Sequence, residues 1–423
     1  MKKILALTAI LLVIFIVLLY ISVSSTDKNF ETCTIKNFED LENTDFHEYD
    51  SVIIAPSTLY KGDILKEFMQ GKNYREAWST SVKVPIVFLD TLKGGMKILK
   101  EGGGKQTHSL KLTNSEGTMF TLRSITKDPK QLIPESAKTL GLENIIVDGI
   151  SAQHPYGAIL AAKLADAAGV LHTNPMVVFV PKQKQLVQYN EKYGNRLYLL
   201  EYETESKKNW TNLQNIEHIV ETDDLQELKQ GNPKHFHIDK SGLIRTRLFD
   251  LLIGDWDRHA EQWGWALQKN GKNFKAIPIP GDRDNAFFNP TGLLPSIITN
   301  KNIEPLVRPF EKTIDHMPGL VYPFDRYFLL NTPEEDFVEQ ARYLQKHLTD
   351  DKIENAFQVW PENIRRLNQE EISEKIKSRK KDLVDYAVSF HKILNEKGEL
   401  TEALKGSEDL QMNEGLMKCF ECN

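Results

Sequence analysis

The spacing of apolar residues changes along this chain, and the changes separate three kinds of segment. An almost uninterrupted apolar run covers residues 4–23. Apolar and polar residues then alternate as in β-strands over 82–126 and again over 176–202. The rest of the chain has mainly helical spacing, with amphipathic helices expected at 334–348 and 370–394. The pattern predicts an apolar N-terminal helix, a β-rich half and a mainly helical half.

The apolar run has the length of a membrane-spanning helix. Its twenty residues would extend about 30 Å as a helix, the thickness of the hydrocarbon layer. Lys2 and Lys3 precede it and should stay cytoplasmic, which places the bulk of the chain outside the cytoplasm. We expect an uncleaved anchor, because the run exceeds a usual signal segment and residues 22–25 offer a weak cleavage site. If cleavage occurs, the protein is secreted.

Composition excludes few classes of function. The chain has 423 residues, enough for two or three domains or one two-lobed unit, and a net charge of −6. This balance gives no indication of a nucleic-acid partner. Cys33, Cys419 and Cys422 are the only cysteines. In an exported protein they suggest a disulfide between two of the three, with the pairing left open.

The segment 253–287 carries the densest candidate chemistry. Strands on either side of the turn 269–272 predict a β-hairpin, which would bring Asp257 and Asp284 to the same end of two adjacent strands. Converging carboxylates beside a cation and an amide suit metal-assisted phosphoryl transfer. A solvated acidic turn is the alternative. Apolar runs on both sides favour a functional cluster, because unpaired charges at the edge of a core are costly.

A glycine-rich turn at 101–107 lies between two predicted strands. Its backbone could approach a phosphate closely and donate N–H groups to it, although a mobile hairpin tip has the same composition. Its position favours the first interpretation. A strand with Arg123 follows, then a helix at 156–168 that Gly169 ends, then two strands and the acidic hairpin.

This order of parts resembles the protein-kinase-like fold, in its atypical branches. Asp257-Arg-His259 resembles the Asp-Arg-His of HipA-type and secretory-pathway kinases, and Asp284-Asn-Ala-Phe287 resembles the metal-binding loop of the latter and of type II phosphatidylinositol kinases. CotH-type spore-coat kinases have a similar pairing. The chain looks closest to exported bacterial proteins that carry Gly-Asp-Trp-Asp-Arg-His. The resemblance would cover residues 80–395. It implies an α+β fold with a β-rich N-lobe and a mainly helical C-lobe.

The resemblance also implies roles for individual residues. Asp257 would orient or deprotonate the acceptor hydroxyl, Arg258 would pair with Asp255 or with phosphate, and His259 would be either structural or catalytic. Mg²⁺ or Mn²⁺ would be held by Asp284, Asp282 and Gln262, where Gln262 replaces an expected Asn. A nucleotide such as ATP would be bound by Gly102, Gly103, Gly104, Lys105, Arg123 and Lys127.

Two departures from the family pattern concern the phosphate-binding cation. Arg123 stands where a Lys is expected, and Lys127 or Lys105 could take its place. The helix at 156–168 has no Glu to pair with this cation, and its Asp166 lies near the wrong end. Trp263 and Trp265 alternate along one strand face and are expected in the core.

These observations predict five segments along the chain. They are a membrane anchor or signal (1–25), a tether and extension (26–80), an N-lobe (81–203), a C-lobe (204–398) and a tail with Cys-x-x-Cys (399–423). The leading hypothesis is a membrane-anchored extracytoplasmic kinase-like phosphotransferase that uses a divalent metal and a nucleotide, with a protein, glycan or lipid acceptor. The alternative is an inactive kinase-like module that binds an envelope glycan, lipid or protein. A metal-dependent hydrolase is a third possibility, but no His pair adjoins the carboxylates.

Overall fold

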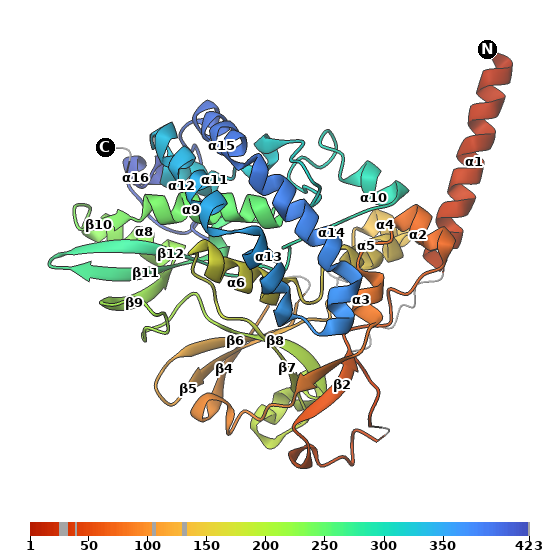
Figure 1. The fold of residues 1–423 in the computed structure, drawn as a ribbon, viewed down its shortest axis with the longest axis horizontal. Coiled ribbons are helices and arrows are strands. Elements are labelled where there is room, and N and C mark those ends of the chain that lie inside the picture. The colour runs from red at the N-terminus through yellow and green to blue at the C-terminus, as the bar shows by residue number, and fades with distance from the viewer. Residues whose placement is uncertain (25–32, 39, 104–106, 129–132, 422–423) are drawn as a thin grey trace.

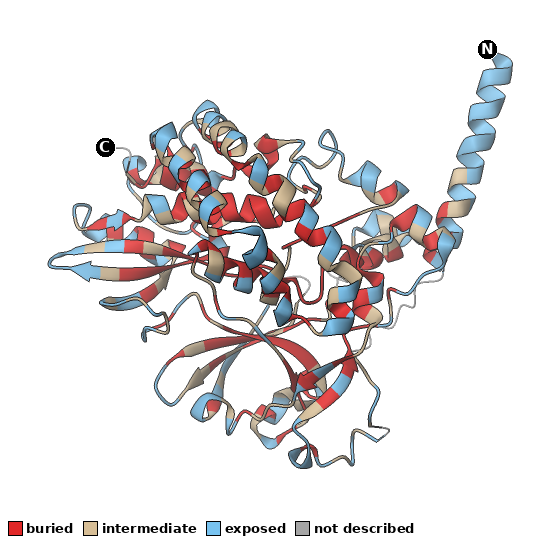
Figure 2. Ribbon diagram, in the orientation of Figure 1, coloured by how far each residue is buried: buried red, intermediate tan, exposed pale blue. Residues whose placement is uncertain are grey.

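The protein has a lower β-rich part and an upper, mainly helical part, and helix α1 projects from one side (Figure 1). The computed structural model describes residues 1–24, 33–38, 40–103, 107–128 and 133–421. The predicted α+β class with a β-rich half before a helical half is therefore confirmed at this level. Gly104, Lys105 and Cys422 lie outside the described residues. Buried residues run through both parts, and exposed residues lie on the outer helices and along most of α1 (Figure 2).

A five-stranded antiparallel sheet forms the lower part. Its strand order is β4-β5-β6-β8-β7. The strands are β4 (Met96–Gly102), β5 (Ser109–Asn114), β6 (Met119–Ser124), β7 (Met176–Val180) and β8 (Arg196–Tyr202). One face carries a core of its own, which includes Leu110, Leu112, Leu122 and Leu200. Leu110 and Leu112 alternate with polar residues in β5, whereas β7 and β8 carry continuous buried runs.

Helix α6 (Gly157–Ala168) connects β6 to β7 and packs its alanine-rich face into the main core. Gly169 ends it in the left-handed conformation with φ 63°, as the sequence predicted. The short helices before α6 are α4 (Glu135–Thr139) and α5 (Glu143–Gly149), and α7 (Asn190–Tyr193) precedes β8.

An N-terminal extension packs beside this sheet. It contains the three-stranded sheet β1-β2-β3 and two short helices: β1 (Thr34–Ile35), β2 (Ser51–Ala55), β3 (Val82–Pro85), α2 (Ile64–Gln70) and α3 (Arg75–Ser79). The stretch 26–50 is expected to be a polar tether. Its described residues depart from that picture, because β1 pairs with β2 and the Phe46 side chain is buried. Isolated apolar residues in a polar stretch were too few to predict this packing.

The upper part combines helices with a second sheet of order β10-β12-β11-β9. Its strands are β9 (Ile216–Glu221), β10 (Phe236–Ile238), β11 (Trp263–Asn270) and β12 (Asn273–Pro280). Its helices are α8 (Thr222–Gly231), α9 (Lys240–Ile253), α10 (Leu293–Ile298), α11 (Pro323–Leu329), α12 (Glu334–His347), α13 (Asp350–Ala356), α14 (Glu362–Lys381), α15 (Leu383–Lys397) and α16 (Glu414–Lys418).

The two predicted amphipathic helices are found, with one correction. The first corresponds to α12. The second, expected as one helix over 370–394, is divided at Asp382 into α14 and α15. Ile376 before the break and Leu383 after it are both buried in the same core. The apolar periodicity therefore continues across the break, and the sequence pattern does not reveal it.

The described residues near the two ends of the chain include a long apolar helix and a tail that packs on the upper part. Helix α1 (Lys2–Ser24) is the one helix among the described residues that is long and apolar enough to cross a membrane. Cys419 is in a disulfide and Cys33 is a free thiol. The tail residues before Cys419 pack on the upper part, and the backbone N–H of Phe420 donates to the carbonyl of Tyr327 at 2.9 Å.

Candidate functional site

The predicted acidic hairpin is present. Strands β11 and β12 pair from Trp263 opposite Pro280 to Asn270 opposite Asn273. The loops before β11 and after β12 therefore leave the same end of the hairpin, one with Asp257 and the other with Asp284. Trp263 and Trp265 are buried and pack on Phe324, so they belong to the core as expected.

Cations from the lower part of the protein reach the acidic loop after β12. The Arg123 Nη1 atom lies 2.7 Å from Asp282 Oδ2, and the Lys127 Nζ atom lies 3.0 Å from Asp284 Oδ2. Burial opposes ionisation of Asp282, but Arg123 and Lys127 outweigh it and hold the pKa of that carboxyl below its ordinary value. Four residues that were predicted separately for nucleotide and metal thus form two ion pairs between the two parts.

Glu201 in β8 is a site residue that sequence reasoning missed. Its carboxylate lies 3.7 Å from Arg123 Nε, and the Thr173 hydroxyl donates to it at 2.6 Å. Glu201 is therefore the carboxylate beside Arg123 that helix α6 does not supply. The Asp166 side chain instead contacts Lys163 and His172. A lone acidic residue in the apolar strand Leu197–Tyr202 was the available signal.

Burial raises the pKa of Glu201 to about 7, although Arg123 and Thr173 act in the opposite direction. A carboxyl whose pKa is higher in the folded state stabilises the fold below its unfolded pKa. That contribution disappears as the pH rises through 7.

We expect Glu201→Gln to become more stable relative to the parent protein as the pH rises from 5 to 8. The relative change should be about 3 kcal/mol at most. Urea denaturation of the full chain in detergent at each pH measures it. Glu362→Gln, at an exposed position on α14, is the control and should show no such trend. A pH-independent difference for Glu201→Gln would show that the carboxyl titrates normally.

Arg258 is buried completely and serves the fold. Its Nη1 atom donates to the carbonyl of Gly281 at 2.8 Å and lies 3.6 Å from Asp255 Oδ2, and its guanidinium packs over the Trp263 ring. Of the two predicted partners, the structure therefore shows Asp255 and leaves no exposed guanidinium for a phosphate. The Nη1 atom also lies 3.4 Å from the amide oxygen of Gln262.

Arg258 belongs to a buried ionic network that joins the two site loops. Asp250 on α9 lies at its centre, 2.7 Å from Arg247, 2.6 Å from Arg283 and 3.4 Å from Arg258. Arg247 also contacts Asp325 on α11 at 2.6 Å, and Arg283 lies 3.5 Å from Asp255. Burial raises the pKa of Asp255 to about 7. The network links α9, the loop before β11, the loop after β12, and α11.

Asp257 and His259 lie at a more exposed part of the loop before β11. Their closest atoms, Oδ1 and Nε2, are 4.0 Å apart. Burial lowers the pKa of His259, which favours the neutral imidazole. Lys405 from the C-terminal tail lies 3.2 Å from His259 Nε2 and 2.6 Å from Glu261. This contact of the tail with the loop has no signal in the sequence.

A cavity of about 280 Å³ lies between the glycine turn and the acidic loops. Gly102, Gly103, Arg123, Gln262 and Asp282 line it, so predicted nucleotide and metal residues meet there. Gly103 has φ +113°, and a Cβ atom added to it would lie 2.2 Å from the Thr107 carbonyl oxygen. This turn therefore requires glycine at that position.

The face of the sheet that lines this cavity is polar. Cross-strand neighbours Lys111, Thr121 and Glu201 lie in one row, and Glu203 follows Glu201 on the same side. The lining contains five acidic residues and two basic ones. Binding of a polyphosphate in this cavity therefore requires further positive charge.

The donor set suits a hard divalent cation. The side chains of Asp282, Asp284 and Gln262 carry oxygen atoms of the kind that Mg²⁺ prefers. Among the described residues, no group of three or more His, Cys, Asp or Glu side chains is already arranged around a common point. Asp282 and Asp284 are paired with Arg123 and Lys127, so a metal would have to replace these ion pairs.

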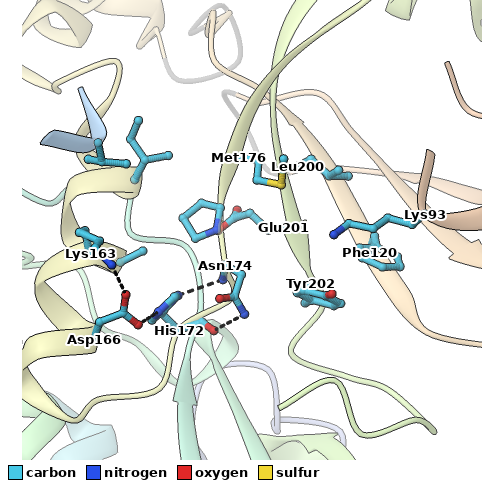
Figure 3. Close-up of a pocket in the computed structure, with 14 residues that line it drawn as sticks. Lys93, Phe120, Lys163, Asp166, His172, Asn174, Met176, Leu200, Glu201 and Tyr202 are labelled. Carbon is cyan, nitrogen blue, oxygen red and sulfur yellow. Dashed lines mark hydrogen bonds and ion pairs between the residues drawn. The ribbon is translucent and has the colours of Figure 1, made fainter. Parts of the chain in front are cut away.

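A second cavity, of about 260 Å³, adjoins the first and shares Glu201 and Tyr202 with it. Figure 3 shows Lys163, Asp166 and His172 on one side of it and the Tyr202 ring on the other. The His172 Nε2 atom lies 2.9 Å from Asp166, whose carboxylate also contacts Lys163 at 3.0 Å.

Comparisons with known proteins find structural likeness at low identity. No family model matches the sequence, and no curated protein does. The Helicobacter pylori proinflammatory kinase CtkA is 14% identical, with a TM-score of 0.36 over 71% of this chain and 96% of that one. A chain from the Shewanella oneidensis MR-1 toxin–antitoxin complex of HipA, HipB and operator DNA is 12% identical, with a TM-score of 0.32 over 77% of this chain and 70% of that one.

Proposed function

We propose that this protein is a metal-dependent, kinase-like phosphotransferase, held by α1 in a membrane with its folded part outside the cytoplasm. One observation carries the proposal: Arg123 on the β-rich side meets Asp282 of the acidic hairpin at a cavity that Gly102 and Gly103 also line. Lys127 and Asp284 form a second ion pair in a smaller cavity that shares Arg123. Phosphoryl transfer needs positioning and charge neutralisation more than covalent chemistry. These residues provide groups that can position a phosphate and groups that can neutralise its charge.

The residues of the site would have the following separate roles. Gly102 and Gly103 let the backbone approach the phosphates, and Arg123 and Lys127 would turn from the aspartates to the phosphate oxygens. Asp282, Asp284 and Gln262 would hold Mg²⁺ or Mn²⁺, which supplies the positive charge that the acidic lining lacks. Asp257 would orient the acceptor hydroxyl and take up its proton. Arg258, through the buried network, keeps the loop in place.

The alternative is a binding module of the same fold without turnover, for an envelope glycan, lipid or protein. The favouring observation is that both aspartates are paired with cations from the protein itself. Such pairs could have replaced metal and nucleotide permanently.

A thermal-shift titration of the full chain in detergent separates these proposals. We expect ATP, GTP or ADP to raise the stability only with Mg²⁺ or Mn²⁺, by about 2.7 kcal/mol when the ligand is at 100 times its Kd. Asp284→Ala should abolish the effect, whereas Asp351→Ala, at an exposed position, should retain it. No shift with any of the three nucleotides would overturn the phosphotransferase proposal and favour the binding module.

A further inference from the structure

The C-terminal end of α1 is packed on the folded part of the protein. Leu19 and Val23 are buried against Met69 of α2 and Leu294 of α10. The Tyr20 hydroxyl donates to the Leu140 carbonyl at 2.8 Å. Two more hydrogen bonds of 3.1 and 2.9 Å join Gln70 to Ser22 and Asn144 to the Val23 carbonyl. The end of helix α1 is therefore packed on the folded part at a defined position.

Apolar side chains are exposed around this attachment. More than half of the exposed large apolar residues outside α1, among those described, lie in α2, in α10, in the loop after it, and at Leu140. We call six of them the basal patch: Ile64, Phe68, Leu140, Leu293, Ile297 and Ile298. Their exposed fractions range from 38% to 89%. Helices α2 and α10 lie beside the end of α1 (Figures 1 and 2).

Helix α10 is held firmly against α2. A Cβ atom on Gly292 would lie 2.2 Å from the Gly71 backbone nitrogen, and one on Gly71 would lie 2.0 Å from the Thr291 carbonyl oxygen. The side chain of Asn73 accepts a hydrogen bond from the Thr291 N–H at 2.9 Å. The residues of the basal patch therefore keep their places relative to α1.

The length of α1 determines how deep the basal patch lies relative to the bilayer. A helix needs about 20 apolar residues to cross the hydrocarbon layer, and the run 4–23 supplies only that number. Its last residues contact α2, α5 and α10. If the run fills the layer, these elements must lie at the edge of the bilayer. Exposed Ile, Leu and Phe side chains suit that depth, whereas in water they would form an apolar patch.

We propose that the basal patch inserts into the lipid interface beside α1, so that the protein rests on the membrane surface with a fixed orientation. The inference rests on the anchoring by α1 that forms part of the proposed function, but not on phosphoryl transfer. The partner is a lipid bilayer, because the patch is continuous with the membrane-length helix.

Reporter fluorescence tests this proposal on the full chain in phospholipid vesicles. An NBD label is placed through Phe68→Cys or Ile297→Cys in a Cys33→Ser background, with brominated lipids as quenchers. Val359→Cys, at an exposed position in the short turn Phe357–Val359, is the matched control. The turn follows α13, which lies away from α1 (Figure 1). A label at Leu11→Cys reports on α1 itself. We expect at least twofold quenching at positions 68, 297 and 11, and none at 359.

The outcomes are distinguishable. Quenching at position 11 without quenching at 68 and 297 overturns the basal patch and leaves the anchor. If position 11 is also unquenched, both the anchor and the patch fail. A fluorescence increase at 68 that rises with the protein-to-lipid ratio, without quenching, would identify a second copy or another protein as the partner and also overturn the proposal. Unfolding temperatures of the labelled variants verify that each is folded.

Discussion

Replacing Asp250 with Ala is expected to lower the free energy of unfolding by about 3–5 kcal/mol. The Asp250 side chain is fully buried and contacts Arg247, Arg258 and Arg283, which are themselves at most 5% exposed. When this carboxylate is removed, the buried guanidinium groups outnumber their carboxylate partners. The free energy of removing these cations from water is then no longer offset by ion pairing. Urea denaturation of the full chain in detergent measures the loss.

An exposed ion pair provides the matched control. Arg366 and Glu362 on α14 are 76% and 64% exposed, so Glu362→Ala should cost less than about 1 kcal/mol. If Asp250→Ala does not fold, the double variant Asp250→Asn with Arg283→Met restores the charge balance and should recover part of the stability. An Asp250→Ala protein as stable as the control variant would contradict the role assigned to the network.

Replacing Asp257 with Asn is expected to reduce phosphate transfer by roughly 10²–10⁴-fold while nucleotide binding persists. Asp257 is partly exposed, its closest atom lies 4.0 Å from His259, and its loop leaves the same end of the hairpin as the loop of Asp284. Asparagine keeps the shape of the side chain but cannot take up a proton. Transfer of labelled γ-phosphate from ATP to water and to the protein itself provides the measurement.

Two comparisons separate chemistry from folding in this experiment. Asp351→Asn, at an exposed position, should retain full transfer. The metal-dependent thermal shift with ATP should remain in Asp257→Asn and disappear in Asp284→Ala. Equal transfer by Asp257→Asn and by the parent protein would exclude Asp257 as the proton acceptor.

The buried network and the candidate site are connected through the chain itself. Arg283 lies between Asp282 and Asp284, and Arg258 lies between Asp257 and His259. In both loops one arginine points into the network while the residues on either side of it are partly exposed. Clamping the intervening arginine restricts the positions of the flanking aspartates, which favours a preorganised site.

Local sequence patterns were sufficient to predict most helices and strands, and the hairpin from which two loops of the candidate site leave. The β-like pattern predicted the strands β4 to β8, but it also predicted a strand at 185–189, where the structure has the 3₁₀ helix Lys184–Tyr189. Gly169 predicted the end of α6, and the turn at 269–272 predicted the hairpin from whose one end the loops of Asp257 and Asp284 leave. These signals depend on neighbours within a few residues, so the sequence contains them completely. The break at Asp382 was missed because the buried face continues through it.

The partners of the charged residues were decided only by the tertiary structure. Glu201 meets Arg123 because β6 and β8 are adjacent in the sheet, although the two residues are far apart in the chain. Three other features also depend on contacts between residues that are far apart in the chain. They are the packing of α1 on α2 and α10, the Asp250 network, and the contact of Lys405 with His259. A sequence shows which side chains carry charge or apolar surface. Which of these side chains contact one another depends on long-range packing. That packing determines whether an aspartate is a buried member of an ion-pair network or an accessible residue of the site.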